Sequence, residues 1–149
     1  TTKYQKNIFM KWFTESAQGI WINRDIADFT AIRKASRALA EGLAVGIAPE
    51  GTRSKTGQLQ EGKPGTGMLA AKARVPIVPV GITGTRNSFR RIFTLRRPEI
   101  TVRFGKAFVI PEFKQGERSA DLQYWTDELM RRIAELLPES YRGVYAEQV

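Results

Sequence analysis

Apolar and polar positions follow two different periods along the chain, which predicts both strands and helices. Residues 43–48 and 75–82 are nearly continuous apolar runs, typical of strands covered on both faces. Residues 19–24 and 100–104 predict two further strands. Because Pro79 has no amide hydrogen to donate, we expect it at an edge, at a bulge or beside a site.

Helical spacing marks four other segments. Residues 25–40 form an amphipathic stripe that Asp25 can cap and Gly42 can end, and residues 65–73 and 119–137 predict two more helices. Residues 4–14 place Trp12 and three other apolar side chains on one face, which suits either a core helix or one lying in a membrane interface. The alternation predicts a single α/β domain over residues 1–149, with three layers and a central, mostly parallel or mixed sheet flanked by helices.

Charge and missing residue types narrow the possible functions. The formal net charge is +9, which favours anionic partners such as a phosphorylated metabolite, nucleic acid or an anionic membrane surface. There is no Cys and no His, so thiolate chemistry and the commonest general base are both unavailable. No apolar run approaches the roughly 18 residues that a membrane-spanning helix needs. The chain does not begin with Met, and we expect that a segment precedes Thr1.

Anion-binding groups are densest directly after the apolar run 43–48. Glu50, Gly51, Thr52, Arg53 and Ser54 follow one another there. Small residues let backbone amides approach a ligand, and a guanidinium matches the oxygens of a phosphate. A solvated Arg in an ordinary loop is the alternative, and the spacing is not that of a P-loop.

Two neighbours could complete this anion site. Arg24 ends the predicted strand 19–24, and in a parallel sheet it would face the same rim as Arg53. Glu50 could accept a hydrogen bond from a substrate hydroxyl or hold Arg53 in place.

A second basic segment, from Arg86 to Arg103, contains six Arg and a single acidic residue, Glu99. Aromatic and aliphatic residues lie between the arginines, as in segments that bind anionic lipid or stack on single-stranded nucleic acid. A solvated loop is equally compatible, and nucleic acid is the weakest reading because no nucleic-acid-binding signature accompanies the segment. The candidate membrane contacts are Phe89, Arg90, Arg91, Phe93, Arg96 and Arg97.

Three blocks of the sequence resemble the glycerolipid acyltransferases of the 1-acylglycerol-3-phosphate acyltransferase type. Residues 19–24 are similar to the second conserved block of that family, Pro49-Glu50-Gly51-Thr52-Arg53-Ser54 to the third, and residues 75–80 to the fourth. The first block, His-x-x-x-x-Asp, has no counterpart here. In the family its His is the general base, so the resemblance implies either a dyad upstream of these residues or a binding domain without catalysis.

The resemblance implies acyl transfer from acyl-CoA or acyl-carrier protein to the hydroxyl of a lysophospholipid. It places the glycerol phosphate at Arg24 and residues 50–54, with Arg53 as the main contact, and it gives Pro79 a part in shaping the acyl-donor or acceptor pocket. It implies no metal or redox cofactor. An enzyme of this kind would be peripheral, on the cytoplasmic face of a membrane.

Overall fold

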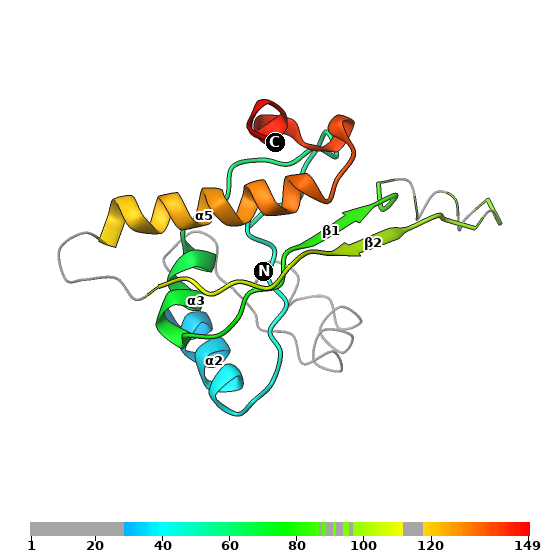
Figure 1. Cartoon of the computed structure of the whole chain (residues 1–149). Coiled ribbons are helices and arrows are strands. Elements are labelled where there is room, and N and C mark those ends of the chain that lie inside the picture. The colour runs from blue at the N-terminus through cyan, green and yellow to red at the C-terminus, as the bar shows by residue number, and fades with distance from the viewer. Residues whose placement is uncertain (1–28, 87, 89–90, 92–93, 96, 112–117) are drawn as a thin grey trace. The chain divides into compact units, whose positions relative to one another are not determined.

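The structure is a computed structural model that describes residues 29–86, 88, 91, 94–95, 97–111 and 118–149 (Figure 1). The chain divides into two compact units, Thr1–Gly46 and Ile47–Val149. Together the described elements are a mixture of helices and a small sheet, so the prediction of an α/β protein is confirmed at that level. The single-domain prediction remains a prediction.

In the first unit the structure describes one helix, α2 (Phe29–Ala40). Gly42 has a φ of +80° and follows the helix as predicted. The amide of Leu43 bonds the carbonyl of Ala38 at 3.0 Å, and that of Gly42 bonds the carbonyl of Leu39 at 3.1 Å. This pair of bonds is the Schellman arrangement, which satisfies the last carbonyls of a helix. The predicted helix 4–14, the predicted strand 19–24 and Arg24 lie outside the described residues.

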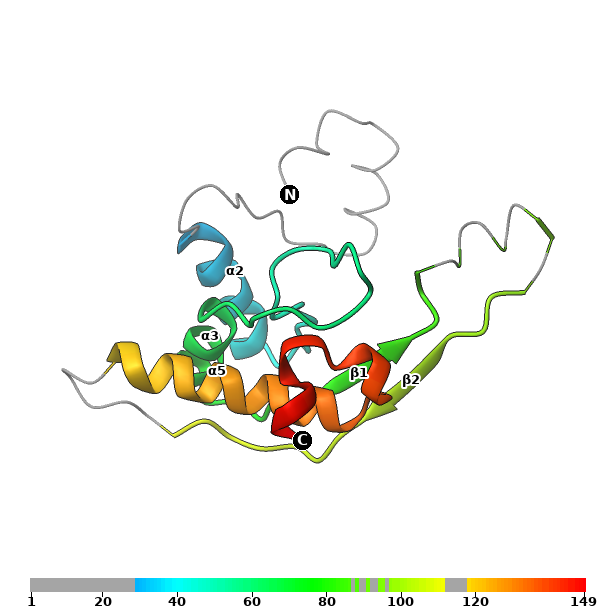
Figure 2. The same ribbon diagram turned by 90° about the horizontal axis from the view of Figure 1, so that it is seen from above.

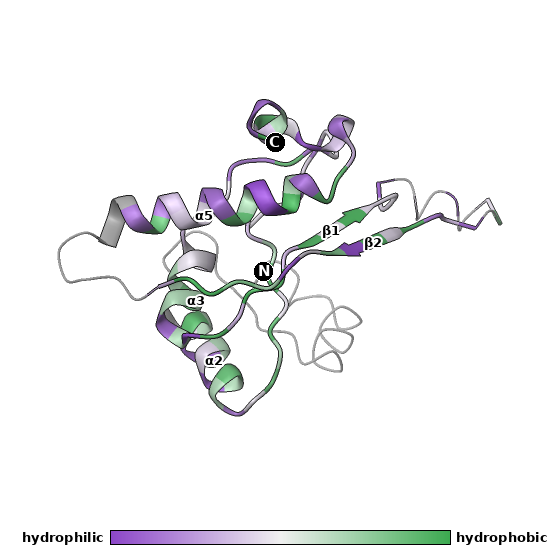
Figure 3. Cartoon of the chain, in the orientation of Figure 1, coloured by the Kyte–Doolittle hydropathy of each residue, from purple (hydrophilic) through white to green (hydrophobic). Residues whose placement is uncertain are grey.

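The second unit is built around its long helix, α5 (Arg118–Glu135). Apolar residues recur between hydrophilic ones along α5 (Figure 3), which agrees with the helical spacing that predicted this helix. Its buried side chains Leu129, Met130 and Ile133 form a core cluster that includes Leu137 and Tyr145. Because Leu129, Ile133 and Leu137 recur every four residues, they share one face and continue the stripe past the end of the helix.

Helix α3 (Gly65–Ala73) has the bounds predicted from the sequence and packs against α5. A Cβ at Gly67 would lie 2.9 Å from the Thr126 hydroxyl, so the two helices approach closely only because Gly67 has no side chain. Ala70 and Ala71 bury their small side chains in a second cluster with Ile110. The predicted Ala-rich packing face is therefore confirmed.

The sheet of the second unit has two described strands, β1 (Val80–Thr83) and β2 (Thr101–Phe104), paired antiparallel with Val80 opposite Phe104. An isolated bridge joins Ile77 to Phe108. Between bridge and ladder, the carbonyl of Pro79 accepts a bond from the Gly105 amide at 2.9 Å. Pro79 thus takes part through its carbonyl alone, which is how a proline can remain next to a ladder.

Two strand predictions need correction. Residues 43–48 lie outside any strand, so the strand predicted there is wrong for this structure. A strand needs a neighbouring strand to pair with, and neither of the described strands pairs with this run. The predicted strand 75–82 forms only from Val80 onward, because its two prolines interrupt pairing. The ladder between described strands is antiparallel, and a parallel pair is not among the elements that the structure describes.

Candidate substrate-binding loop

The candidate site is the loop of residues 49–63, which we name the acceptor loop after the substrate that the resemblance implies. Its two ends are joined, since the amide of Lys63 donates to the carbonyl of Pro49 at 2.7 Å. The loop opens with a tight turn in which the Gly51 amide bonds the Ala48 carbonyl at 3.0 Å. Gly51 has a φ of +65°, a conformation that glycine adopts without steric cost.

Glu50 ties the start of the acceptor loop to its return. Its side chain is half-buried, and its Oε2 accepts a bond from the Gln60 amide at 3.0 Å. Burial raises the pKa of the Glu50 carboxyl, and the bond from Gln60 partly opposes this by lowering the pKa. The carboxylate therefore has a structural role that spacing alone could not assign.

Thr52 and Arg53 are exposed on this loop, as is Lys55. The hydroxyl of Ser54 accepts a bond from the Gly57 amide at 2.9 Å and lies 3.2 Å from the Thr56 hydroxyl. Ser54 thus braces the next turn, while Arg53 presents its charge at the surface. Substrate contacts by residues 50–54 stay predictions.

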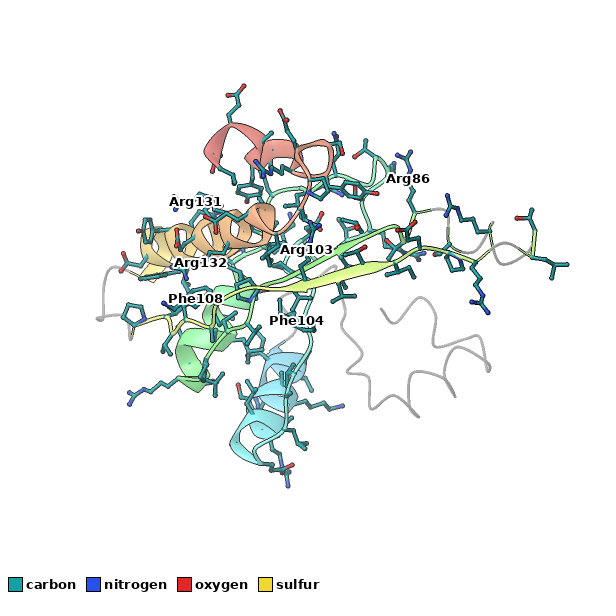
Figure 4. All side chains as sticks on the ribbon, turned by 45° about the vertical axis from the view of Figure 1, so that its right-hand side comes forward. Arg86, Arg103, Phe104, Phe108, Arg131 and Arg132 are labelled. Atoms are coloured by element: carbon teal, nitrogen blue, oxygen red, sulfur yellow. The ribbon has the colours of Figure 1, made fainter. Side chains whose placement is uncertain are left out.

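Arg86 is a cation at the acceptor loop that sequence analysis did not assign to it. Its guanidinium donates to the carbonyl of Thr56, and a Cβ at Gly57 would lie 3.1 Å from the Arg86 Cδ. Figure 4 shows Arg86 beyond β1, reaching to this loop. Thirty residues separate Arg86 from Thr56, and no periodicity in the sequence joins them.

Lys63 is a further cation at the neck of the loop. Its Cγ lies 3.3 Å from the position that a Gly51 Cβ would occupy. Together with Arg53, Lys55 and Arg86, it sets four cations against the two acidic residues of the loop, Glu50 and Glu61. Such a set of donors can neutralise a dianionic phosphate.

Pro79 is fully buried, and its Cβ is 3.5 Å from the position of a Cβ on Gly105. The structure thus gives Pro79 a packing role beside the strands, and its part in an acyl or acceptor pocket stays a prediction. Arg24 lies outside the described residues, so its convergence with Arg53 also stays a prediction.

The connection between β1 and β2, residues 84–100, carries the predicted membrane contacts. Arg91 and Arg97 are exposed, and Leu95 exposes 97% of its surface with a φ of +55°. Four of the predicted contacts lie outside the described residues: Phe89, Arg90, Phe93 and Arg96.

The described residues contain neither a metal-ion cluster nor a membrane-spanning helix. Within the described ranges, no group of three or more Asp or Glu side chains is arranged to hold a metal ion. Among the same residues, no helix has the length and apolar character needed to span a bilayer.

Comparisons with known proteins identify the family of the chain. The model of the acyltransferase family matches residues 1–83, which is more than half of the 149 residues and includes the whole loop. The chain belongs to the acyltransferase family, so the resemblance predicted from the three blocks is confirmed.

The relatives that the chain resembles share one name, 1-acyl-sn-glycerol-3-phosphate acyltransferase. The protein from Cocos nucifera is 31% identical over 123 residues, covering 81% of this chain and 39% of the relative. The protein from Limnanthes douglasii is 38% identical over 80 residues, covering 52% and 28%. That from Borreliella burgdorferi is 39% identical over 56 residues, covering 38% and 22%. The chain therefore spans about two-fifths or less of these relatives. No solved structure gives a significant match.

Proposed function

We propose that this chain is the acceptor-binding part of an enzyme that transfers a fatty acyl group from a thioester to the hydroxyl of 1-acylglycerol-3-phosphate. The observation that carries the proposal is the acceptor loop, closed at its neck by the 2.7 Å bond from Lys63 to Pro49, with Arg53 exposed on it. The names of the relatives supply the substrate class.

A closed loop suits this role because binding then orders little additional chain. The guanidinium of Arg53 would donate two parallel hydrogen bonds to the phosphate oxygens. A Lys ammonium is a point charge and does not offer this geometry. Thr52 and the amides near Gly51 would add neutral donors. Arg24 and Ser54 complete the proposed set, and Pro79 would shape the neighbouring acyl pocket.

The reaction needs a general base, and these 149 residues contain no His that could serve as one. The acceptor hydroxyl attacks the thioester carbonyl, its proton passes to a base, and the thiolate leaves and is protonated as the ester forms. We propose that a His-x-x-x-x-Asp dyad elsewhere in the full-length enzyme supplies that base. The co-substrate is acyl-CoA or acyl-carrier protein, and the proposal includes no metal or redox cofactor.

We also propose a peripheral location on the cytoplasmic face of a membrane. The net charge of +9 and the exposure of Arg91, Leu95 and Arg97 support contact with anionic lipid. The acceptor is itself a lipid, so a surface of this kind would bring the enzyme to its substrate.

The full-length enzyme, we further propose, has three layers around a larger and mostly parallel sheet. The apolar side chains of β1 and β2 support this: Ile82, Val102 and Phe104 expose 50, 46 and 72% of their surface. Figure 4 shows Phe104 on the side of β2 opposite Arg103, whose guanidinium bonds the Leu136 carbonyl after α5 at 3.1 Å. An apolar face opposite a helix is what a third layer would cover.

Labelling of a substituted cysteine can test the third layer, because a label found within these 149 residues, which contain no Cys of their own, marks the substituted position. Phe104→Cys in the full-length enzyme should react with a maleimide at least tenfold more slowly than Leu95→Cys. Equal labelling rates would contradict a covered face.

The proposed reaction is tested with the purified full-length enzyme. It should acylate 1-acylglycerol-3-phosphate from acyl-CoA or acyl-carrier protein and should leave lysophosphatidylcholine almost unchanged, because choline screens the phosphate from Arg53. Equal transfer to both acceptors would contradict a phosphomonoester site. Binding without any transfer would instead identify a phospholipid-binding domain.

A further inference from the structure

Hydrogen bonds join the acceptor loop to the C-terminal segment of the chain. Two short 3-10 helices follow α5, η2 (Glu139–Tyr141) and η3 (Gly143–Gln148). The amide of Leu59 donates to the carbonyl of Tyr141 at 2.9 Å, and the side-chain amide of Gln58 donates to the carbonyl of Ser140 at 3.2 Å. Figure 1 shows these C-terminal turns beside the loop. The family model ends at residue 83, so this support comes from outside the matched region.

Tyr145 makes the side-chain connection between this C-terminal segment, the acceptor loop and α5. Its hydroxyl accepts a bond from the Gly62 amide at 3.2 Å and lies 3.2 Å from Oδ1 of Asp127, to which it donates. The side chain is buried, with 3% of its surface exposed. Burial raises the pKa of Tyr145, and the charge of Asp127 raises it further. The hydroxyl therefore keeps its proton at neutral pH and can donate to Asp127.

Gly62 has little freedom to shift away from Tyr145. A Cβ at Gly62 would lie 2.7 Å from the side chains of both Thr126 and Met130. The next residue, Lys63, closes the neck of the loop through its bond to Pro49. The Tyr145 hydroxyl thus bonds the backbone one residue before the point where the loop closes.

We propose that Tyr145 is a positioning residue for the acceptor site: by fixing Gly62 against Asp127 of α5, it sets the neck of the acceptor loop and so the placement of Arg53. This inference rests on the proposed function of the loop. It assigns to the C-terminal segment a part in acceptor affinity.

The test is Tyr145→Phe in the full-length enzyme, a change that keeps the ring in the core and removes both hydrogen bonds. The matched control is Tyr141→Phe, because the bond from Leu59 reaches Tyr141 at its backbone carbonyl. We expect the KM for 1-acylglycerol-3-phosphate to rise about tenfold in Tyr145→Phe, with kcat within about twofold, since two hydrogen bonds of ordinary strength are lost away from the reacting atoms. Tyr141→Phe should leave both constants within about twofold.

Hydrogen exchange separates positioning from a loss of fold. In Tyr145→Phe, exchange of the Gly62 amide should accelerate about tenfold while the amides of α5 keep their protection. Faster Gly62 exchange with an unchanged KM would overturn the inference and leave the proposed function intact. A wild-type enzyme without activity on this acceptor would overturn the proposed function itself.

A double substitution gives an independent check. If Asp127 acts on the loop only through its hydrogen bond with Tyr145, adding Asp127→Ala to Tyr145→Phe should raise the KM little further. If the KM increase of the double variant equals the product of the increases in the two single variants, the proposed connection through Asp127 is wrong.

Discussion

Two basic loops of the second unit are supported in opposite ways. The acceptor loop is bonded to the C-terminal turns at Leu59 and Gly62 and is closed at its neck by Lys63. The described bonds within the β1–β2 connection join near neighbours, such as the Ser88 amide to the carbonyl of Thr85 and the Thr94 amide to that of Arg91. Figure 2 shows β1 and β2 extending past the C-terminal end of α5 toward this connection.

The difference in support matches the different ligands that we propose for the two loops. A loop fixed at several points can present Arg53 to one phosphate at low entropic cost. A connection whose described bonds mostly join near neighbours can spread Arg91 and Arg97 over a surface whose charges are not fixed in place. Arg86 links the two regions, because it belongs to the connection and bonds Thr56 of the acceptor loop.

The largest effect should come from removing charge from the β1–β2 connection. Changing its four clustered arginines to Ser should weaken binding to anionic liposomes by about 10³-fold, since each basic residue near such a surface contributes about 1 kcal/mol. Sedimentation with liposomes at low salt measures this. The residues are Arg90, Arg91, Arg96 and Arg97.

A control of equal charge is available among exposed cations elsewhere: Arg33, Lys34, Lys72 and Lys106. Changing these four to Ser should reduce binding much less. An equal loss from both sets would mean that net charge alone drives binding and would remove the distinction between the connection and the rest of the surface.

Gly143→Ala should strongly destabilise the support of the acceptor loop. Gly143 has a φ of +54°, and its Cβ would lie 2.0 Å from the Leu59 carbonyl oxygen. The strained φ and the clash together should cost about 3 kcal/mol, or roughly 10 °C in Tm. Gly42→Ala is the control, since Gly42 has a φ of +80° with nothing within 4 Å of its Cβ. Similar losses in both variants would show that the contact with Leu59 is unimportant.

Gly62→Ala should have a smaller but clear effect. Its Cβ would meet the side chains of Met130 and Thr126 at 2.7 Å, and because the Met130 side chain is flexible, partial relaxation should limit the cost to about 2 kcal/mol. Gly65→Ala is the matched control, because nothing lies within 4 Å of its Cβ and Ala favours the helix. Urea unfolding of the two variants measures the difference. Equal midpoints would contradict close packing at the neck of the loop.

Glu50 should give the smallest effect, visible as a dependence on pH. Burial raises its folded-state pKa above the ordinary 4.5, so the folded state binds this proton more tightly than the unfolded state. The resulting stabilisation is present below pH 4.5 and is lost as pH rises through the raised pKa. Glu50→Gln lacks this titration, so its Tm relative to the wild type should increase between pH 4 and pH 7. A constant difference in Tm across that range would contradict the raised pKa.

Local patterns predicted the helices better than the sheet. The bounds of α3 and the left-handed Gly42 follow from residues next to each other in sequence, as does the stripe of α5. The strand prediction for residues 43–48 was wrong because a strand depends on a partner strand, which is often distant in sequence. An apolar run does not specify that partner.

The candidate site shows the same limit. The composition of residues 50–54 indicated anion binding, yet the contacts that hold the loop come from Arg86, Tyr141 and Tyr145. These residues follow their partners in the loop by 30 to 83 positions, and the roles of Tyr141 and Tyr145 arise only when α5 brings the C-terminal turns back across the chain. Tyr145 in particular looks like an ordinary core aromatic until its hydroxyl is seen to bond Gly62.

The central claim is that Arg53, on a fixed loop, binds the phosphate of the acceptor. It is tested most directly by the kcat/KM of the full-length enzyme for 1-acylglycerol-3-phosphate in neutral detergent micelles, where no anionic lipid surface is present. Arg53→Ala should lower kcat/KM by about 10- to 100-fold, the loss expected for charge-assisted hydrogen bonds, while Arg97→Ala should change it by less than about twofold. Equal effects of the two substitutions, or full activity in Arg53→Ala, would contradict the account.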